Sequence, residues 1–172
     1  MTHPRFNCIP NPMQRLIILR HGDAEMATPG TRDFERGLTA TGRAEAARAG
    51  RLLAEAGAIP ALAIVSDARR ARETWEAAAP AFPGAELRLD HSLYNAPVHV
   101  LAEAAEAALA QADAVILVGH NPGLHGLALH LASRDGPSQA LASGFPTGAA
   151  AVFAITDGKP SFERLVRGDL GA

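Results

Sequence analysis

The sequence predicts an α/β fold built on a mostly parallel sheet. Three short apolar runs predict the strands, because each is continuous and bounded by other residue types, as in strands that are covered on both faces. These runs are 16–19, 61–65 and 114–118. Segments with helical character separate them, and strands that alternate with helices are typical of α/β proteins.

Four segments have the composition and end signals of helices, and they cover 39–56, 67–79, 98–111 and 122–133. The first opens on Thr39 as a cap and closes at Gly57. The last has Asn121 as its expected cap and a proline in its first turn.

The two ends of the chain differ from this alternating pattern. Runs 149–156 and 162–166 flank the turn 157–160 and predict a hairpin near the edge of the sheet. Residues 1–14 contain three prolines and no periodicity, so we expect a flexible leader there. No linker or repeat divides 15–172, which we expect to form a single domain.

Composition excludes several classes of protein. The 172 residues are 48% apolar and 20% charged, which is typical of a globular chain with one sizeable core. The lone Cys8 cannot form an internal disulfide and favours a reducing compartment. A net charge of −2 without a basic run argues against nucleic acid, and no apolar stretch is long enough for a membrane span. We therefore expect a cytoplasmic protein.

Polar residues gather where the apolar runs end. In open α/β sheets, ligands bind outside the carboxyl ends of the strands, so these residues are the first candidates for a site. They are Arg20 and His21 after the first run, Arg69, Arg70 and Arg72 after the second, and His120 and Asn121 after the third.

This set of residue types favours phosphate chemistry. Guanidinium groups match phosphate oxygens, and a helix that begins after Asn121 offers free backbone N–H groups to an anion. A neutral imidazole attacks phosphorus, so His21 is the candidate nucleophile. A second imidazole, His120, would stabilise the charge on the phosphoryl oxygens if it were cationic beside them.

Each candidate also has a structural interpretation. A single histidine at a strand end is more often a hydrogen-bonded structural residue, and arginines on a helix usually face solvent. The segment 119–123 could form only a turn between a strand and a helix. Arg20 favours the functional interpretation, because a guanidinium leaving a buried strand is costly unless an anion meets it.

Other chemistries fit the residues less well. A zinc site of His21, His120 and Asp23 is disfavoured because the arginines would repel a cation, so we expect no metal and no other cofactor. The loop of the cysteine phosphatases is absent, because Cys8 lacks an arginine at the sixth position after it. The nucleotide-binding pattern G-x-x-x-x-G-K-[ST] is absent as well. A module that binds phosphate without turnover is the alternative outside the enzymes.

Four segments together resemble the histidine phosphatase (phosphoglycerate mutase-like) superfamily. They read LIILRHG over 16–22, LTATGR over 38–43, SDARRARET over 66–74 and VGHNPG over 118–123. The last form resembles the SixA-like phosphohistidine phosphatase branch. The resemblance implies a three-layer α/β/α sandwich and a metal-independent phosphatase that acts through a phosphohistidine intermediate.

The resemblance also implies roles for single residues. His21 becomes the phosphate acceptor, with Arg20 and Arg70 as clamps and His120 as the second histidine of the pocket. Arg70 is preferred to its neighbours because it occupies the R-A-x-x-T register of the family. Asp33 and Arg36 match a D-x-x-R lead-in of the same branch, for which we expect a structural ion pair.

One departure from the family concerns the proton donor. Other branches place a glutamate after the third strand, whereas the corresponding stretch 90–95 reads DHSLYN. An imidazole leaves phosphorus with less help than an alkoxide does, so the missing acid favours phosphohistidine as substrate. Asp23, Asp90 and His91 stay open as donors. The expected partner is a phosphorylated protein of the histidine phosphotransfer type, with a small phosphoester as the alternative.

Overall fold

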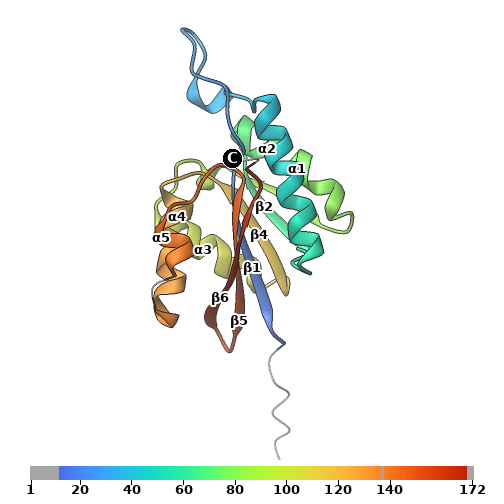
Figure 1. Cartoon of the computed structure of the whole chain (residues 1–172), viewed down its shortest axis with the longest axis vertical. Helices are drawn as coiled ribbons and strands as arrows, with labels where there is room; N and C mark the ends of the chain where they lie inside the picture. The colour runs from blue at the N-terminus through green and yellow to red at the C-terminus, as the bar shows by residue number, and fades with distance from the viewer. Residues whose placement is uncertain (1–11, 137, 170–172) are drawn as a thin grey trace, which may run out of the picture.

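The computed structural model describes residues 12–136 and 138–169, and a six-stranded sheet forms its centre (Figure 1). The strand order is β3-β2-β4-β1-β5-β6. The strands are β1 (Gln14–Arg20), β2 (Leu62–Ser66), β3 (Glu86–Asp90), β4 (Ala114–Gly119), β5 (Ala149–Thr156) and β6 (Lys159–Arg167). The first four are mutually parallel, and β5 and β6 add an antiparallel hairpin. This confirms the predicted fold class.

Helices cover both faces of this sheet. Helices α1 (Ala40–Glu55) and α2 (Arg69–Ala78) lie on one side, and α3 (Val98–Leu109), α4 (Gly123–Ala132) and α5 (Gln139–Ala142) lie on the other (Figure 1). Strand β1 supplies both cores because its side chains alternate. Leu16 and Ile18 pack into the core under α3 and α4, and Ile17 and Leu19 pack into the core under α1 and α2.

The helix ends follow the chemistry of their caps. The Thr39 hydroxyl accepts the N–H of Gly42 at 3.0 Å and so begins α1, as expected. The amide oxygen of Asn121 accepts the N–H of His125 at 3.2 Å. Asn121 lies one residue before the N-cap position of α4, which Pro122 occupies.

The hairpin and one edge strand differ from the expectations. The turn consists of Asp157 and Gly158, both with positive φ, and is shorter than 157–160. Pro160 lies inside β6, where the edge of the sheet tolerates a missing N–H. Strand β3 was not predicted, because this edge strand alternates exposed leucines with charged residues instead of forming an apolar run.

The expected leader overlaps the first strand. Strand β1 already begins at Gln14, and the first eleven of the fourteen leader residues lie outside the described residues. In the part of the chain that the structure describes, no helix has the length and apolar character needed to cross a bilayer.

A close backbone contact joins the end of β1 to the start of α1. A Cβ atom on Gly22 would overlap the carbonyl oxygen of Gly42, and one on Gly42 would overlap that of Asp23. Both obstacles are backbone atoms that cannot rotate away. The glycines therefore let α1 begin directly against the segment that follows Arg20.

We expect Gly42→Ala to lower the free energy of unfolding by about 2 kcal/mol or more, because overpacking against a rigid neighbour forces the backbone apart. Chemical denaturation monitored by circular dichroism measures the change. Gly84→Ala is the matched control, because a Cβ there would meet no atom of the described residues within 4 Å. Equal stability of the two variants would contradict this close packing.

Candidate functional site

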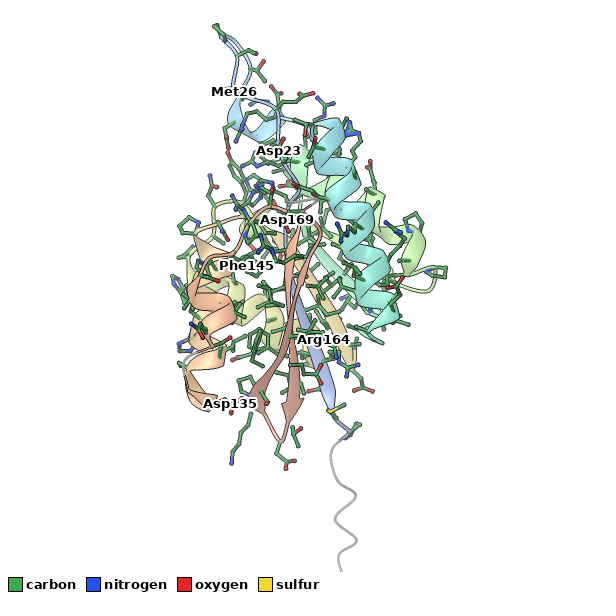
Figure 2. The ribbon with its side chains drawn as sticks, viewed as in Figure 1. Asp23, Met26, Asp135, Phe145, Arg164 and Asp169 are labelled. Atoms are coloured by element: carbon green, nitrogen blue, oxygen red, sulfur yellow. The ribbon has the colours of Figure 1, made fainter. Side chains whose placement is uncertain are left out.

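The candidate residues meet in one cavity at the carboxyl ends of the parallel strands. The cavity has a volume of about 550 Å³, and Arg20, His21, Arg70, His120 and Asn121 all line it. Many nitrogen atoms gather between the labelled Asp23 and Phe145 in Figure 2. The structure thus brings together five of the seven residues that follow the apolar runs, while Arg69 and Arg72 lie exposed on α2.

His21 has a defined tautomer. Its backbone N–H donates to the Gly119 carbonyl at 3.1 Å, which extends the pairing of β1 with β4 beyond Arg20. Its Nδ1 lies 2.7 Å from the Gly22 carbonyl oxygen, which only accepts hydrogen bonds. Nδ1 must therefore carry the hydrogen, and Nε2 of the neutral ring keeps a lone pair. Burial lowers the pKa of His21 to about 4, so the ring is neutral near pH 7.

His120 lies beside His21, with the ring centroids 5.3 Å apart. Its Nε2 is 2.8 Å from the Ser66 hydroxyl, which already accepts the N–H of Ala68. The hydroxyl hydrogen is thus available to Nε2, which would leave the ring N–H on Nδ1. Burial, followed by the neighbouring His21, lowers the pKa of His120 to about 3. Both rings are neutral in the free site.

Arg20 and Arg70, two of the three arginines that line the cavity, are held at their outer nitrogens. Arg20 Nη1 donates to the Phe145 carbonyl at 2.9 Å, and burial lowers the pKa of its guanidinium. Arg70 is 3% exposed, and its Nη1 and Nη2 donate to Asp33 at 2.7 and 3.0 Å. Each guanidinium is thereby held, and the Nε of each has no hydrogen-bond partner among the described residues.

Three buried side-chain nitrogens have no hydrogen-bond partner within residues 12–136 and 138–169. They are Arg20 Nε, Arg70 Nε and His120 Nδ1. A buried unsatisfied donor costs about 1–3 kcal/mol, so native proteins contain few of them. All three belong to residues that line the same cavity. Oxygen atoms of an anionic ligand would satisfy them.

Asn121 holds the rim of this cavity. Its amide nitrogen donates to the same Phe145 carbonyl that Arg20 contacts, at 2.9 Å, while its oxygen holds the start of α4. One amide hydrogen remains for a ligand. A part in phosphate binding therefore stays a prediction.

The three candidate proton donors differ in position. Asp23 lines the cavity, and its carboxylate accepts the Thr39 hydroxyl at 2.7 Å. Asp90 instead accepts the N–H and hydroxyl of Ser92 at a turn. The side chain of His91 is 74% exposed and pairs with Asp67 at 3.0 Å. Of these three candidates, only Asp23 belongs to the described residues that line the cavity.

Sequence reasoning missed several residues of the site. Asn95 and Thr147 line the cavity, and Tyr94 packs edge-on against His120 with ring centroids 5.5 Å apart. Tyr94 and Asn95 lie in the stretch 90–95, where the expected proton donors are Asp90 and His91. Thr147 lies two residues after Phe145, in a loop without apolar periodicity. No sequence pattern therefore pointed to Thr147.

A metal centre has no support in this geometry. In the described part of the chain, no group of three or more His, Cys, Asp or Glu side chains is placed to hold a metal ion. His21, His120 and Asp23 all line the cavity, but Arg20, Arg36 and Arg70 line it as well. Three guanidinium charges disfavour a bound cation.

Comparisons with known proteins identify a family and similar solved structures. The family model of the histidine phosphatase superfamily (branch 1) matches residues 16–97. A structure of the putative phosphohistidine phosphatase SixA from Agrobacterium tumefaciens is 35% identical, with a TM-score of 0.81 over 89% of this chain and 97% of that one. The corresponding putative protein of Nakamurella multipartitia is 27% identical, with a TM-score of 0.77 over 91% and 97% of the two chains.

A curated plant sequence matches over a shorter stretch. An uncharacterized chloroplastic protein of Arabidopsis thaliana is 43% identical over 61 residues, which are 36% of this chain and 28% of the plant protein. This chain therefore spans less than a third of the length of that relative.

The neutral imidazoles predict a loss of stability in acid. Because the pKa of each ring is lower in the folded state than its ordinary value of 6.5, the unfolded chain binds protons first as the pH falls. Stability should then decrease from about pH 6.5 to about pH 4, by up to about 1.4 kcal/mol per pH unit for each ring. Urea unfolding across this range measures the slope. His120→Gln should reduce it, and an unchanged slope would contradict the buried neutral ring.

Proposed function

This chain belongs to the histidine phosphatase superfamily and is a phosphatase, and from that premise we propose that it removes phosphate from phosphohistidine on a protein, through a phosphohistidine intermediate on His21. One observation carries the proposal. The three buried unpartnered donors of Arg20, Arg70 and His120 line the same cavity as the unprotonated nitrogen of His21.

The first chemical step is transfer to His21. Its Nε2 lone pair forms a bond to phosphorus while the P–N bond of the substrate breaks, and the leaving imidazole nitrogen takes that electron pair and a proton. The hydrogen bond from Nδ1 to the Gly22 carbonyl at 2.7 Å supports this step, because it keeps the attacking nitrogen free of hydrogen.

The second step releases the product. A water oxygen forms a bond to phosphorus, the bond to Nε2 breaks, and His21 regains its lone pair. One proton of this water stays on the inorganic phosphate, and the other replaces the proton taken up by the leaving group. Arg20 and Arg70 neutralise the phosphoryl oxygens in both steps.

The charge of His120 would change with the ligand. Its ring is neutral in the free site because burial and the adjacent His21 lower its pKa to about 3. A phosphoryl dianion beside the ring would favour the protonated form. We therefore expect His120 to take up a proton as phosphate binds, which supplies a positive charge only when the oxygens need it.

The position of the acidic groups supports a P–N substrate over an ester. Asp23 is the one candidate donor that lines the described cavity, and the Thr39 hydroxyl holds its carboxylate as an acceptor. An alkoxide needs a strong positioned acid, whereas protonation of imidazole is easier. The similarity to putative phosphohistidine phosphatases favours the same substrate class.

A labelling experiment tests the intermediate. With a radiolabelled phosphohistidine peptide and rapid quenching, we expect one acid-labile phosphoryl group per chain on His21, because a phosphoramidate hydrolyses in acid. His21→Asn should carry no label, and His130→Asn, which changes an exposed histidine of α4, should keep it. An active enzyme that never carries label would contradict covalent catalysis.

Substrate preference tests the identity of the bond that is cleaved. We expect kcat/KM for a phosphohistidine peptide to exceed that for a phosphoserine peptide of the same sequence by roughly a hundredfold, since general acid catalysis contributes about 10²–10⁴-fold to ester cleavage. Phosphate release from both peptides gives the ratio. A higher kcat/KM for the ester would favour a small-molecule or phosphoester phosphatase instead.

A further inference from the structure

Asp33 makes more contacts than an ion pair requires. Its Oδ1 does accept Arg36 Nε at 3.0 Å and Nη2 at 2.9 Å, which is the pairing expected from the sequence. Its Oδ2 also accepts the Tyr94 hydroxyl at 2.6 Å and Arg70 Nη2 at 3.0 Å. The backbone carbonyl of the same residue accepts Arg70 Nη1 at 2.7 Å.

Arg70 and Asp33 differ in how deeply their side chains are buried. The Arg70 side chain is 4% exposed, whereas that of Asp33 is 48% exposed. Asp33 comes from a short 3-10 helix, η1 (Asp33–Glu35), in the segment between β1 and α1. The segment that stands out from the sheet, along which Figure 2 labels Asp23 and Met26, therefore supplies the anion for a buried guanidinium.

The guanidinium of Arg70 has a second edge that Asp33 leaves open to a ligand. Its planar group has one edge formed by Nη1 and Nη2 and another formed by Nε and Nη2. Asp33 occupies the first edge with its carbonyl and carboxylate oxygens. The Nε of Arg70, on the second edge, is buried and has no partner among the residues described by the structure. That edge keeps two N–H groups for two oxygens of a ligand.

Tyr94 extends this arrangement to the second histidine. Its hydroxyl is held by Asp33, and its ring lies 5.8 Å from the Arg70 guanidinium carbon. The same ring packs edge-on against His120. One carboxylate therefore holds both the cation and the aromatic ring that packs against His120.

We propose that Asp33 is a positioning residue, which grips one edge of Arg70 so that the Nε edge is presented to two oxygens of the phosphoryl group. This inference rests on the proposed function, in which Arg70 is a phosphate clamp. Asp33 does not touch the reacting atoms and acts through Arg70. Arg36, on the far oxygen of the carboxylate, holds Asp33 in turn.

A rival interpretation makes Asp33 a competitor of phosphate. A carboxylate that occupied the ligand-binding edge would have to leave before phosphate could bind. The unpartnered Nε argues against this, since Asp33 and a ligand would use different edges. Hydrogen bonds, chiefly that from Tyr94, lower the pKa of Asp33 to about 2, so the carboxylate remains an acceptor throughout the working pH range.

Binding of inorganic phosphate, measured by calorimetry on the full chain, tests the proposal. Asp33→Asn should weaken phosphate binding about tenfold and lower kcat/KM by about 10–100-fold, the range seen when groups that orient a ligand are removed. The same substitution in an Arg70→Lys background should change binding less than twofold, because lysine keeps the charge but has no edge to orient. Tighter or unchanged phosphate binding in Asp33→Asn would overturn the proposal, and so would equal losses in both backgrounds.

Two further variants separate positioning from charge and folding. Glu35→Gln removes a carboxylate from the same 3-10 helix, where it pairs with Arg32 at 2.8 Å, and should leave phosphate binding unchanged. If Asp33→Asn fails to fold, Asp33→Glu in the two backgrounds replaces it, because it keeps the charge and moves the carboxylate. Phosphate binding does not depend on the substrate, so a failure of the phosphohistidine assignment would appear in turnover alone.

Discussion

The register of β1 on β4 is the constraint on which the site depends. Arg20 lies opposite Gly119 in this parallel pair, so His21 and His120 leave the sheet from neighbouring positions. The backbone hydrogen bond between His21 and Gly119 carries the pairing one residue further, and the Gly148 N–H holds the His21 carbonyl from the side of β5. A shift of one residue would turn alternate side chains to the opposite face. The 5.3 Å separation of the two rings follows from the ladder more than from any contact between them.

The charges around the cavity then determine which kind of ligand it can bind. Arg70 brings a buried charge and Arg20 a half-buried one, while burial keeps both imidazoles neutral. The acidic residues of the lining are already engaged, Asp23 by Thr39 and Asp33 by Tyr94 and two arginines. The cavity therefore has fixed donors and no free anion of its own among the described residues. Phosphate is the type of ligand that completes such a set.

The loops around the sheet keep this geometry rigid. The contact of Gly22 with Gly42 seats the segment that carries His21 directly against α1, and the Phe145 carbonyl joins Arg20 to Asn121. Groups from distant parts of the chain thus hold Arg20, Arg70, His120 and Asn121, whereas the neighbouring Gly22 carbonyl holds the ring of His21. A site ordered before its ligand arrives loses less entropy on binding and needs less rearrangement in the transition state.

The amino-acid sequence by itself determined the features that are local in the chain. Continuous apolar runs predicted β1, β2 and β4, and Thr39 and Gly57 predicted the ends of α1, because periodicity and capping act within a few residues. The same locality explains why β3 and the place of Pro160 were missed, since neither an exposed edge strand nor a tolerated proline can be recognised without knowing the neighbours in the sheet.

Only the tertiary structure decided which side chains share the cavity and how they are held. The position of Arg70 behind an apolar strand made it a candidate, but its grip by Asp33, thirty-seven residues away, depends on how η1 folds over α2. The tautomer of His21 depends on how the folded backbone places the Gly22 carbonyl against the ring, and the unpartnered nitrogens arise from burial by other segments. Pairing at such distances is a property of the packed chain, because hydrogen-bond geometry and desolvation exist only once the layers have come together.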